Sequence, residues 1–194
     1  ITVSGTSTQT SIIDNAMVTN KAQSAGDVAV QNLASNVGTV SVDKSIHFTG
    51  TSNQTANVVG ATLKNEANSS SNSCSGPDCR DGALAYQNAA SNMGEVNISG
   101  ISTQVVGISG SGTTVSNTAK GANTVAVQNM SSNYGKVNIS GSSSQTTSIY
   151  GASVVANLAN GAFAHAYQNI ASNDSCDPPP VVCVGPACGP YAMR

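Results

Sequence analysis

The five cysteines are the residues whose type and spacing could do chemistry, and they gather in two short segments. Cys74 and Cys79 flank Ser-Gly-Pro-Asp, Cys183 and Cys188 flank Val-Gly-Pro-Ala, and Cys176 lies just upstream of the second pair. A Gly-Pro turn inside such a short loop brings the two sulfur atoms of each pair close enough to bridge. We therefore predict the disulfides Cys74–Cys79 and Cys183–Cys188, with Cys176 left over to cross-link subunits.

Other uses of these cysteines stay open. Zinc sites usually have two residues between paired cysteines and often a nearby histidine, whereas here four residues intervene and no histidine is close. Zinc binding and a redox role are the competing interpretations, and disulfides exchanged between subunits are a further arrangement. Because structural disulfides persist in oxidising compartments, the cysteines indicate a secreted, extracellular or cell-surface protein.

The remaining residues with catalytic potential lack the partners that catalysis needs. Gly-x-Ser-x-Gln occurs four times, and no Gly-x-Ser of the chain has the second glycine of a nucleophile elbow. His47 and His165 occupy positions where the other copies of an internal repeat carry unrelated residues, so we expect surface histidines. No recurring carboxylate pair and no phosphate-binding loop is present. The sequence predicts a protein that is not an enzyme and that uses no cofactor or metal.

The Gly-x-Ser-x-Gln motif belongs to a repeat of four copies, each made of three blocks. The first block ends in this motif, the second places an apolar residue, Asn and Ala at alternate positions, and the third reads Ala-x-Gln-Asn and continues to Ser-Asn. In copy order, the first-block glutamines are Gln9, Gln54, Gln104 and Gln145, the second-block asparagines are Asn20, Asn65, Asn117 and Asn157, and the third-block glutamines are Gln31, Gln87, Gln128 and Gln168.

The spacing of two within each block is the period of a β-strand. In the third block one face keeps Ala, Gln and Ser, while the other changes from Val125 and Val127 to Leu84 and Tyr86. We predict that the constant face points inward and that the varying face is at least partly exposed. A buried Gln amide needs partners, and the same Gln in neighbouring copies can provide them. The sequence therefore predicts amide ladders, as in cross-β stacks, formed by these glutamines and asparagines.

The fold class that follows is all-β: a β-solenoid or cross-β stack of four imperfect rungs of about 40 residues. Each rung should contain about three strands joined by β-arcs, with turns where Gly and Asn gather, as at Asn92-Met-Gly94. An unrelated β-sandwich is the competing fold. The rungs are placed at 1–45, 46–95, 96–136 and 137–173, with inserts at about 40–45 and 68–81 and a Cys/Pro-rich tail at 174–194.

The composition limits the partners. Lys and Arg number 7, Asp and Glu number 9, and the formal net charge is −2. The scattered basic residues cannot form the stripe that nucleic acid requires, and no apolar stretch approaches the roughly 20 residues of a membrane span. Because in-register stacking places like charges within about 5 Å, we expect charges in turns and inserts. The residues concerned are Asp43, Lys44, Asp78, Arg80, Asp81, Glu95, Lys136 and Asp174.

The ends of the stack suggest a way to assemble. Terminal solenoid rungs expose unpaired backbone groups unless a cap covers them. The first repeat begins at Ile1, so we expect a mature chain already trimmed at its start, with no cap before the first rung. An uncovered first rung can pair with the last rung of another molecule, and that head-to-tail contact produces a filament. The alternative is a monomer whose tail, from about Asp174, folds over one end.

The imperfect repeats with Gln and Asn at fixed strand positions, the few charges, the variable inserts and the Cys-bearing tail resemble bacterial functional amyloids. The resemblance is to the Fap fibre subunit in particular and more distantly to the curli major subunit, and it covers residues 1 to about 173. The Fap tail carries Cys-x-x-Cys, whereas four residues separate the paired cysteines here. The resemblance implies secretion through an outer membrane and assembly into biofilm fibres.

Two functions of different classes follow from these observations. The first is a structural subunit of an extracellular filament, with other copies of the same chain as its partners, polymerising head-to-tail by stacking of rungs. The second is a monomeric secreted adhesin or surface-binding module that uses an exposed face of the solenoid. Ice binding would require a regular array of Thr, and the Thr residues here are irregularly placed.

Overall fold

The computed structural model describes residues 1–23, 27–37, 45–69 and 82–174 of the chain. The described residues are all-β and contain no helix. They form four rungs of five strands each, where the sequence suggested about three strands per rung. The predicted inserts lie largely outside the described residues, as does the tail beyond Asp174.

The strands follow the same order in each rung. Rung 1 contains β1 (Thr2–Val3), β2 (Thr6–Asp14), β3 (Met17–Ala22), β4 (Val28–Leu33) and β5 (Asn36–Val37). Rung 2 contains β6 (Ser45–Phe48), β7 (Thr51–Val59), β8 (Thr62–Asn68), β9 (Leu84–Ala89) and β10 (Asn92–Met93). Rung 3 contains β11 (Glu95–Ile98), β12 (Ile101–Ser109), β13 (Thr114–Lys120), β14 (Val125–Met130) and β15 (Asn133–Tyr134). Rung 4 contains β16 (Val137–Ile139), β17 (Ser142–Ile149), β18 (Val154–Asn160), β19 (His165–Ile170) and β20 (Asn173–Asp174).

Equivalent strands of successive rungs pair in parallel and form five four-stranded sheets. We call them the base sheet (β1, β6, β11, β16), the wall sheet (β2, β7, β12, β17), the roof sheet (β3, β8, β13, β18), the inner sheet (β4, β9, β14, β19) and the corner sheet (β5, β10, β15, β20). The pairing is in register with the sequence repeat. Gln128 of β14, for example, pairs with Gln87 of β9 and with Gln168 of β19.

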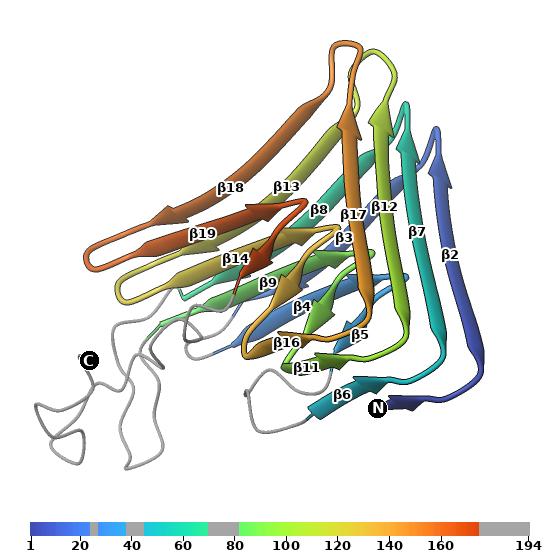
Figure 1. Ribbon diagram of the computed structural model, residues 1–194. Helices are drawn as coiled ribbons and strands as arrows, with labels where there is room; N and C mark the ends of the chain where they lie inside the picture. The colour runs from blue at the N-terminus through green and yellow to red at the C-terminus, as the bar shows by residue number, and fades with distance from the viewer. Residues whose placement is uncertain (24–26, 38–44, 70–81, 175–194) are drawn as a thin grey trace, which may run out of the picture.

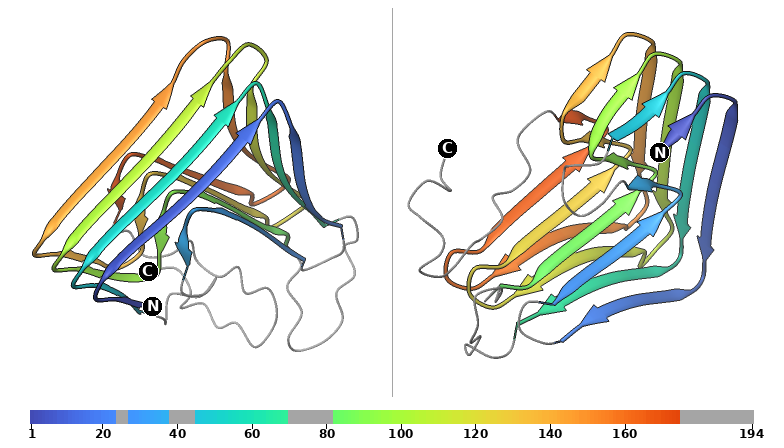
Figure 2. Two further views of the ribbon diagram at one scale, coloured as in Figure 1. Left: turned by 90° about the vertical axis from the view of Figure 1, so that its right-hand side faces the viewer. Right: turned by 90° about the horizontal axis from the view of Figure 1, so that it is seen from below.

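The sheets enclose a core with a triangular outline. The wall and roof sheets meet at the turns between their strands, and the inner sheet runs back beneath the roof (Figure 1). The corner sheet then leads down to the base sheet of the next rung. Seen from the side, the four long strands of the wall lie next to one another in rung order (Figure 2, left).

The β4–β5 corner shows how local sequence shapes each rung. Its first residue has a positive φ in all four rungs: Ala34, Ala90, Ser131 and Ala171 have φ of 49°, 49°, 47° and 51°. This left-handed conformation turns the chain sharply at a single residue. It is unfavourable for residues other than Gly, so the packing around the corner must compensate.

The core consists of small and β-branched side chains in layers. Between roof and inner sheets lies a cluster of alanines, which includes Ala67, Ala119 and Ala126. Their small size lets the two sheets approach closely, so that polar side chains of one sheet reach the backbone of the other. Larger apolar residues fill the space near the turns that join the wall and roof sheets, where Leu63, Ile108 and other residues pack together.

The varying face of the inner sheet is buried in the middle rungs, so the expectation that it is partly exposed was wrong. Tyr86 is 6% exposed and Val127 is fully buried. The reason is the corner sheet, because Met93 and Tyr134 pack against this face. In rung 1 the same face is more open, and Val28 is 40% exposed.

Charged residues also occur within strands, which corrects the expectation that they lie in turns and inserts. Glu95 begins β11, Asp174 ends β20, and Lys64 and Glu66 both lie in β8. Opposite charges make the β8 positions favourable, because Lys64 Nζ is 2.7 Å from Glu66 Oε2 and Lys120 Nζ is 3.6 Å from Glu66 Oε1. The stack thus excludes repeated like charges rather than charge itself. Of the residues expected in turns and inserts, Lys136 does lie between β15 and β16, whereas Asp43, Lys44, Asp78, Arg80 and Asp81 lie outside the described residues.

Candidate assembly interface

The predicted asparagines of the second block form a ladder through the roof sheet. Asn20 donates from Nδ2 to Oδ1 of Asn65, Asn65 to Asn117, and Asn117 to Asn157, each over 2.8 Å. Asn117 also donates to the carbonyl oxygens of Ala85 and Val127 in the inner sheet, at 3.0 Å each. The ladder therefore joins successive rungs and also joins the roof to the inner sheet.

The third-block glutamines form a second ladder, in the inner sheet, with the opposite direction of donation. Gln87 donates to Gln31 over 2.7 Å, Gln128 to Gln87 over 2.7 Å, and Gln168 to Gln128 over 2.6 Å. Each donor thus lies one rung above its acceptor, whereas in the roof ladder each donor lies one rung below. The two directions give the stack a chemical polarity.

The first-block glutamines of the wall stack in register but do not form a continuous amide ladder. Gln54 donates to Gln9 at 3.4 Å, whereas Gln104 donates across the interior to Asn133 Oδ1 at 3.1 Å. Gln145 likewise donates to Asn173 of the corner sheet, at 2.8 Å. The ladder expected for this column is therefore present at one step only. The amide nitrogens bind the corner sheet instead, because its asparagines face them across the core.

The structure contains two further ladders that the sequence did not predict. The asparagines that follow the third-block glutamines form one, in which Asn129 donates to Asn88 over 2.8 Å. The corner asparagines form another, in which Asn92 donates to Asn133 over 2.7 Å. The recurrence of Asn in the Ser-Asn that ends each third block was the available signal, but it was interpreted as part of a turn. The full sets are Asn32, Asn88, Asn129 and Asn169, and Asn36, Asn92, Asn133 and Asn173.

The ladder directions leave complementary groups open on the two end rungs. On rung 1, Asn20 Oδ1 has no donor and Asn32 Nδ2 has no acceptor among the described residues. On rung 4, within the same part of the chain, Gln168 Oε1 and Asn169 Oδ1 have no donor and Asn173 Nδ2 has no acceptor. Each end rung therefore presents the groups that the opposite end lacks.

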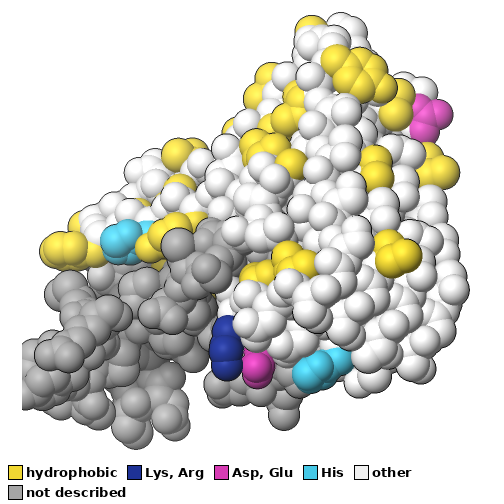
Figure 3. Space-filling model, in the orientation of Figure 1, with side chains coloured by type: hydrophobic (Ala, Val, Ile, Leu, Met, Phe, Trp, Pro, Cys, Tyr) yellow, Lys and Arg dark blue, Asp and Glu magenta, His cyan; other side chains and the backbone are white. Residues whose placement is uncertain are grey.

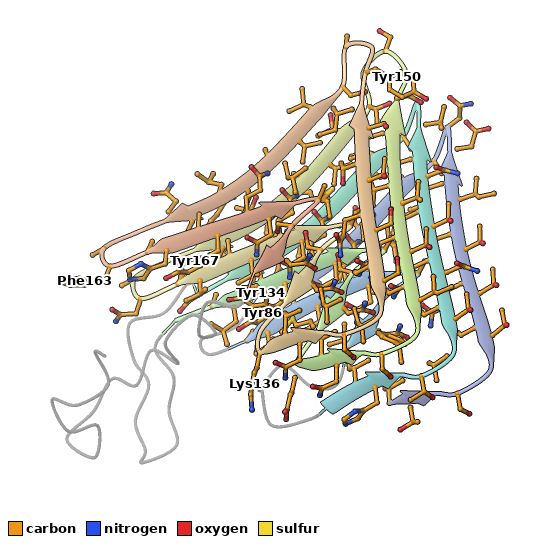
Figure 4. The ribbon with its side chains drawn as sticks, viewed as in Figure 1. Tyr86, Tyr134, Lys136, Tyr150, Phe163 and Tyr167 are labelled. Atoms are coloured by element: carbon orange, nitrogen blue, oxygen red, sulfur yellow. The ribbon has the colours of Figure 1, made fainter. Side chains whose placement is uncertain are left out.

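Apolar side chains are also exposed mainly on the end rungs. Met17 on rung 1 is 77% exposed, and Phe163 on rung 4 is 79% exposed. Figure 4 shows Phe163 and Tyr150 at opposite turns of the roof sheet in rung 4. Positions that are buried in the middle rungs become exposed in the end rungs. Ala126 is fully buried in rung 3, whereas its register partner Ala166 in rung 4 is exposed.

A column of glycines marks the corner between base and wall sheets. A Cβ added to Gly50 would lie 2.0 Å from the carbonyl oxygen of Gly5, and a Cβ added to Gly100 would lie 2.0 Å from that of Gly50. For Gly141 the corresponding distance to Gly100 is 2.1 Å. Each of these three positions must therefore be glycine, because the backbone of the rung below occupies the space that a Cβ would need. At Gly5 a Cβ would meet nothing within 4 Å.

Apart from Asp174 at the end of β20, the charged residues of the described ranges belong to rungs 1 to 3 or to the connections between rungs. Residues 137–173 contain no Asp, Glu, Lys or Arg. The main charged cluster is centred on Glu66 in rung 2, where a hydrogen bond from the Lys64 ammonium lowers the pKa of the carboxyl group. Burial opposes this shift, and the nearby charges of Lys120 and Lys21 add to it. Rung 4 is thus uncharged from Val137 to Asn173.

The described residues offer little for other chemistry. His47 and His165 are exposed, and no group of three potential metal ligands occurs within the described ranges. A shallow groove of about 370 Å³ crosses the outer face of the base sheet near His47, Asn97 and Asn138.

No helix in the described part of the chain is long and apolar enough to cross a membrane. The predicted disulfide residues Cys74, Cys79, Cys183 and Cys188, and the remaining Cys176, lie outside the described residues.

Comparison of the chain with family models, with curated proteins and with solved structures found no match in any of the three.

Proposed function

We propose that this chain is a structural subunit of an extracellular filament and that it polymerises when rung 1 of one molecule stacks on rung 4 of the next. The complementarity of the open ladder groups on the two end rungs is the observation that carries the proposal. The secreted location rests on the cysteine pattern and on the resemblance to functional amyloids. The role is structural, because polymerisation requires only the stacked rungs themselves.

The amide ladders would continue across the junction without a change of geometry. Gln31 of the added molecule would donate to Gln168 Oε1, as Gln168 donates to Gln128 within one molecule. Asn20 of the added molecule would accept from Asn157 Nδ2, as Asn157 accepts from Asn117. Each new contact repeats one that already holds two rungs together, so the junction needs no new type of interaction.

The apolar side chains also match across the junction. The register of the sheets would place Val18 over Val155 and Leu33 over Ile170, which are equivalent positions of the repeat. Burial of apolar surface stabilises by about 25 cal/mol per Å², so covering the exposed end rungs favours association. Since residues 137–173 of rung 4 include no charged residue, no like charges meet over this part of the junction.

A head-to-head pair of molecules would not satisfy the same groups. If two copies met through rung 4, Gln168 Oε1 of one copy would face acceptors of the other, and the strands at the junction would run antiparallel. The parallel pairing found between every pair of rungs would be lost at that junction. Ladder polarity therefore favours an open head-to-tail contact, which repeats without closing.

Gly5 provides a direct test. In the isolated molecule a Cβ at Gly5 meets nothing within 4 Å, so Gly5→Ala should fold normally. In a head-to-tail filament that Cβ would point at the carbonyl oxygen of Gly141 below it, at about the 2 Å separation seen at Gly50, Gly100 and Gly141. Such an approach is sterically forbidden. The substitution should therefore block assembly without affecting the fold.

The experiment compares wild type, Gly5→Ala and the neighbouring control Thr6→Ala, which adds no atoms at the junction. Sedimentation and negative-stain microscopy should show filaments for the wild type and the control, and monomers with unchanged melting temperature for Gly5→Ala. X-ray diffraction from aligned filaments should show the roughly 4.8 Å rung spacing. The proposal fails if the wild type stays monomeric at high concentration, or if Gly5→Ala polymerises as well as the control.

A further inference from the structure

The outer face of the wall sheet is a continuous surface of small side chains, nearly all of them uncharged. Its outward residues alternate with buried ones along each strand and stack in five columns. The columns begin at Thr6, Thr8, Thr10, Ile12 and Asp14 of β2 and continue through their register partners in the later rungs. We call this surface the wall face. Its only charged residue is Asp14, at the end next to the β2–β3 turn of rung 1, and every other residue on it is Thr, Ser, Asn, Val, Ile or Gly.

Apart from Asp14, the charges of the described residues lie on other surfaces. Lys64, Glu66 and Lys120 belong to the roof sheet, and Glu95 and Lys136 lie beside the base sheet. Figure 3 shows the right-hand side of the molecule as mainly uncharged polar surface with scattered apolar side chains. Protein surfaces designed for solubility carry about 25–35% charged residues, so a sheet face of this size whose single charge is Asp14 at one end suits contact better than hydration.

We propose that the wall face packs against the wall face of a second filament, so that the mature fibre contains paired filaments. This inference rests on the proposed function. Packing of a face against its own copy would set any charged column beside like charge, and no column of the wall face is charged throughout: Asp14 is the single charge, at one end of the face and on one rung in four. Columns of Ser, Thr, Asn and β-branched residues on facing sheets can interdigitate and exclude water.

The shape of the wall sheet supports this pairing. Its four strands run nearly parallel when viewed face-on (Figure 2, left). Sheets normally twist, and flat sheets are usually stabilised by stacking against another sheet. The side chains of the wall face are also short, and the bulkiest among them are isoleucines, such as Ile12 and Ile101. Two such faces could therefore approach to about the usual 10 Å between packed sheets.

The area of the wall face explains why the second copy should be a filament rather than a single molecule. Nine residues at about 3.3 Å and four rungs at about 4.8 Å give a face of roughly 30 by 19 Å, or about 570 Å². A stable interface usually buries about 800 Å² per partner, so two monomers would pair weakly through this face. In a filament the areas add along the axis. Lateral pairing should therefore follow head-to-tail assembly and should not precede it.

Mass per length gives a quantitative test. One 19.3 kDa subunit for each roughly 19 Å of axis gives about 1 kDa/Å for a single filament and about 2 kDa/Å for a pair. The test variant is Thr55→Lys, which places a charge in the centre of the wall face. The matched control is Thr118→Lys in β13, an outward position of similar exposure on the roof sheet beside Glu66. Scanning transmission electron microscopy measures the mass per length of each filament.

Wild type and Thr118→Lys should give about 2 kDa/Å, and Thr55→Lys should give half that value with the same axial repeat. One Lys every 19 Å is separated from its axial copies by more than the Debye length of about 8 Å, so it should not prevent stacking. Wild-type filaments of about 1 kDa/Å would overturn the pairing and leave the proposed function intact. Thr55→Lys filaments of 2 kDa/Å would show that another face pairs. Absence of filaments in all three proteins would remove the proposed function and this inference with it.

Discussion

Gln128 donates a hydrogen bond from Nε2 to Oε1 of Gln87, 2.7 Å away in the rung below. The same nitrogen donates to the carbonyl oxygen of Ala156 in the roof sheet at 3.2 Å, and Gln128 Oε1 accepts from Gln168 at 2.6 Å. The side chain is fully buried, so water cannot replace a lost partner. This amide joins rung to rung and sheet to sheet at the same point.

Replacing Gln128 with Leu should lower the free energy of unfolding by about 1 to 3 kcal/mol. The apolar side chain leaves the buried Gln87 oxygen without its donor, and a buried unsatisfied group costs about 1–3 kcal/mol, whereas the exposed Gln168 amide can bind water. Urea unfolding followed by circular dichroism measures the change. Gln168→Ala is the control: Gln168 is exposed in the isolated molecule, and its truncation lets water reach Gln128 Oε1, so it should cost less than half as much. Equal losses for the two variants would contradict the ladder.

Gly100→Ala should destabilise the isolated molecule by about 3 kcal/mol or more. The new methyl group would lie 2.0 Å from the carbonyl oxygen of Gly50, so two rungs would have to separate locally. Differential scanning calorimetry of the monomer would report a lowered melting temperature. Gly5→Ala, which makes the same change at the open end of the same column, should melt with the wild type. A normal melting temperature for Gly100→Ala would argue against the close stacking of the rungs.

The ion pair at Glu66 should make stability depend on pH in the acidic range. The Lys64 hydrogen bond lowers the pKa of Glu66 in the folded state, so the carboxylate stabilises the fold above its unfolded pKa of about 4.3. This stabilisation is lost as the pH falls through the lowered folded pKa. Because the two lysines are nearly half exposed, its size should be at most about 1 kcal/mol.

Melting temperatures of wild type and Glu66→Gln, measured from pH 7 to pH 2 in low salt, check this expectation. The wild type should be more stable at neutral pH, and the two curves should converge at the acidic end. Addition of 0.5 M salt should reduce the difference at neutral pH. A gap that stays constant down to pH 2 would show that the carboxylate charge is not responsible.

Ala171→Gly should stabilise the last rung by up to about 1 kcal/mol. Ala171 has a φ of 51°, which Gly adopts without the steric cost that a Cβ adds. The residue is exposed, so little packing is lost. Ala166→Gly in β19 is the control: it is exposed too but lies within a strand, where Gly should cost about 0.5 kcal/mol or more. Chemical denaturation should shift the two midpoints in opposite directions.

The repeat was readable from the sequence because stacking acts on each position separately. A residue that lies over its own equivalent must satisfy the same size and hydrogen-bonding limits in every rung, so Asn117 and Gln128 recur in all four copies. The same reasoning located the glycine column, since Gly100 recurs at a fixed place in the first block. The period of two then identified which face of the inner sheet points to the core.

The repeat pattern did not indicate which residues cover the other face of the inner sheet. The change from Val127 to Tyr86 at equivalent positions suggested an exposed face, but Met93 and Tyr134 cover that face in the folded molecule. The corner asparagines, such as Asn133, were assigned to a turn because two-residue strands leave almost no periodic signal. Contacts between different sheets depend on how the chain folds back within a rung, which the repeat does not encode.

By itself, the sequence determined that four segments stack in register and which side chains repeat along the stack, because each of those contacts joins a residue to its own equivalent. The tertiary structure alone decided how the five strands of a rung enclose the core, which direction each ladder donates, and where the wall glutamines find their partners. Those contacts join unlike positions across the interior, and their geometry depends on the distances between sheets.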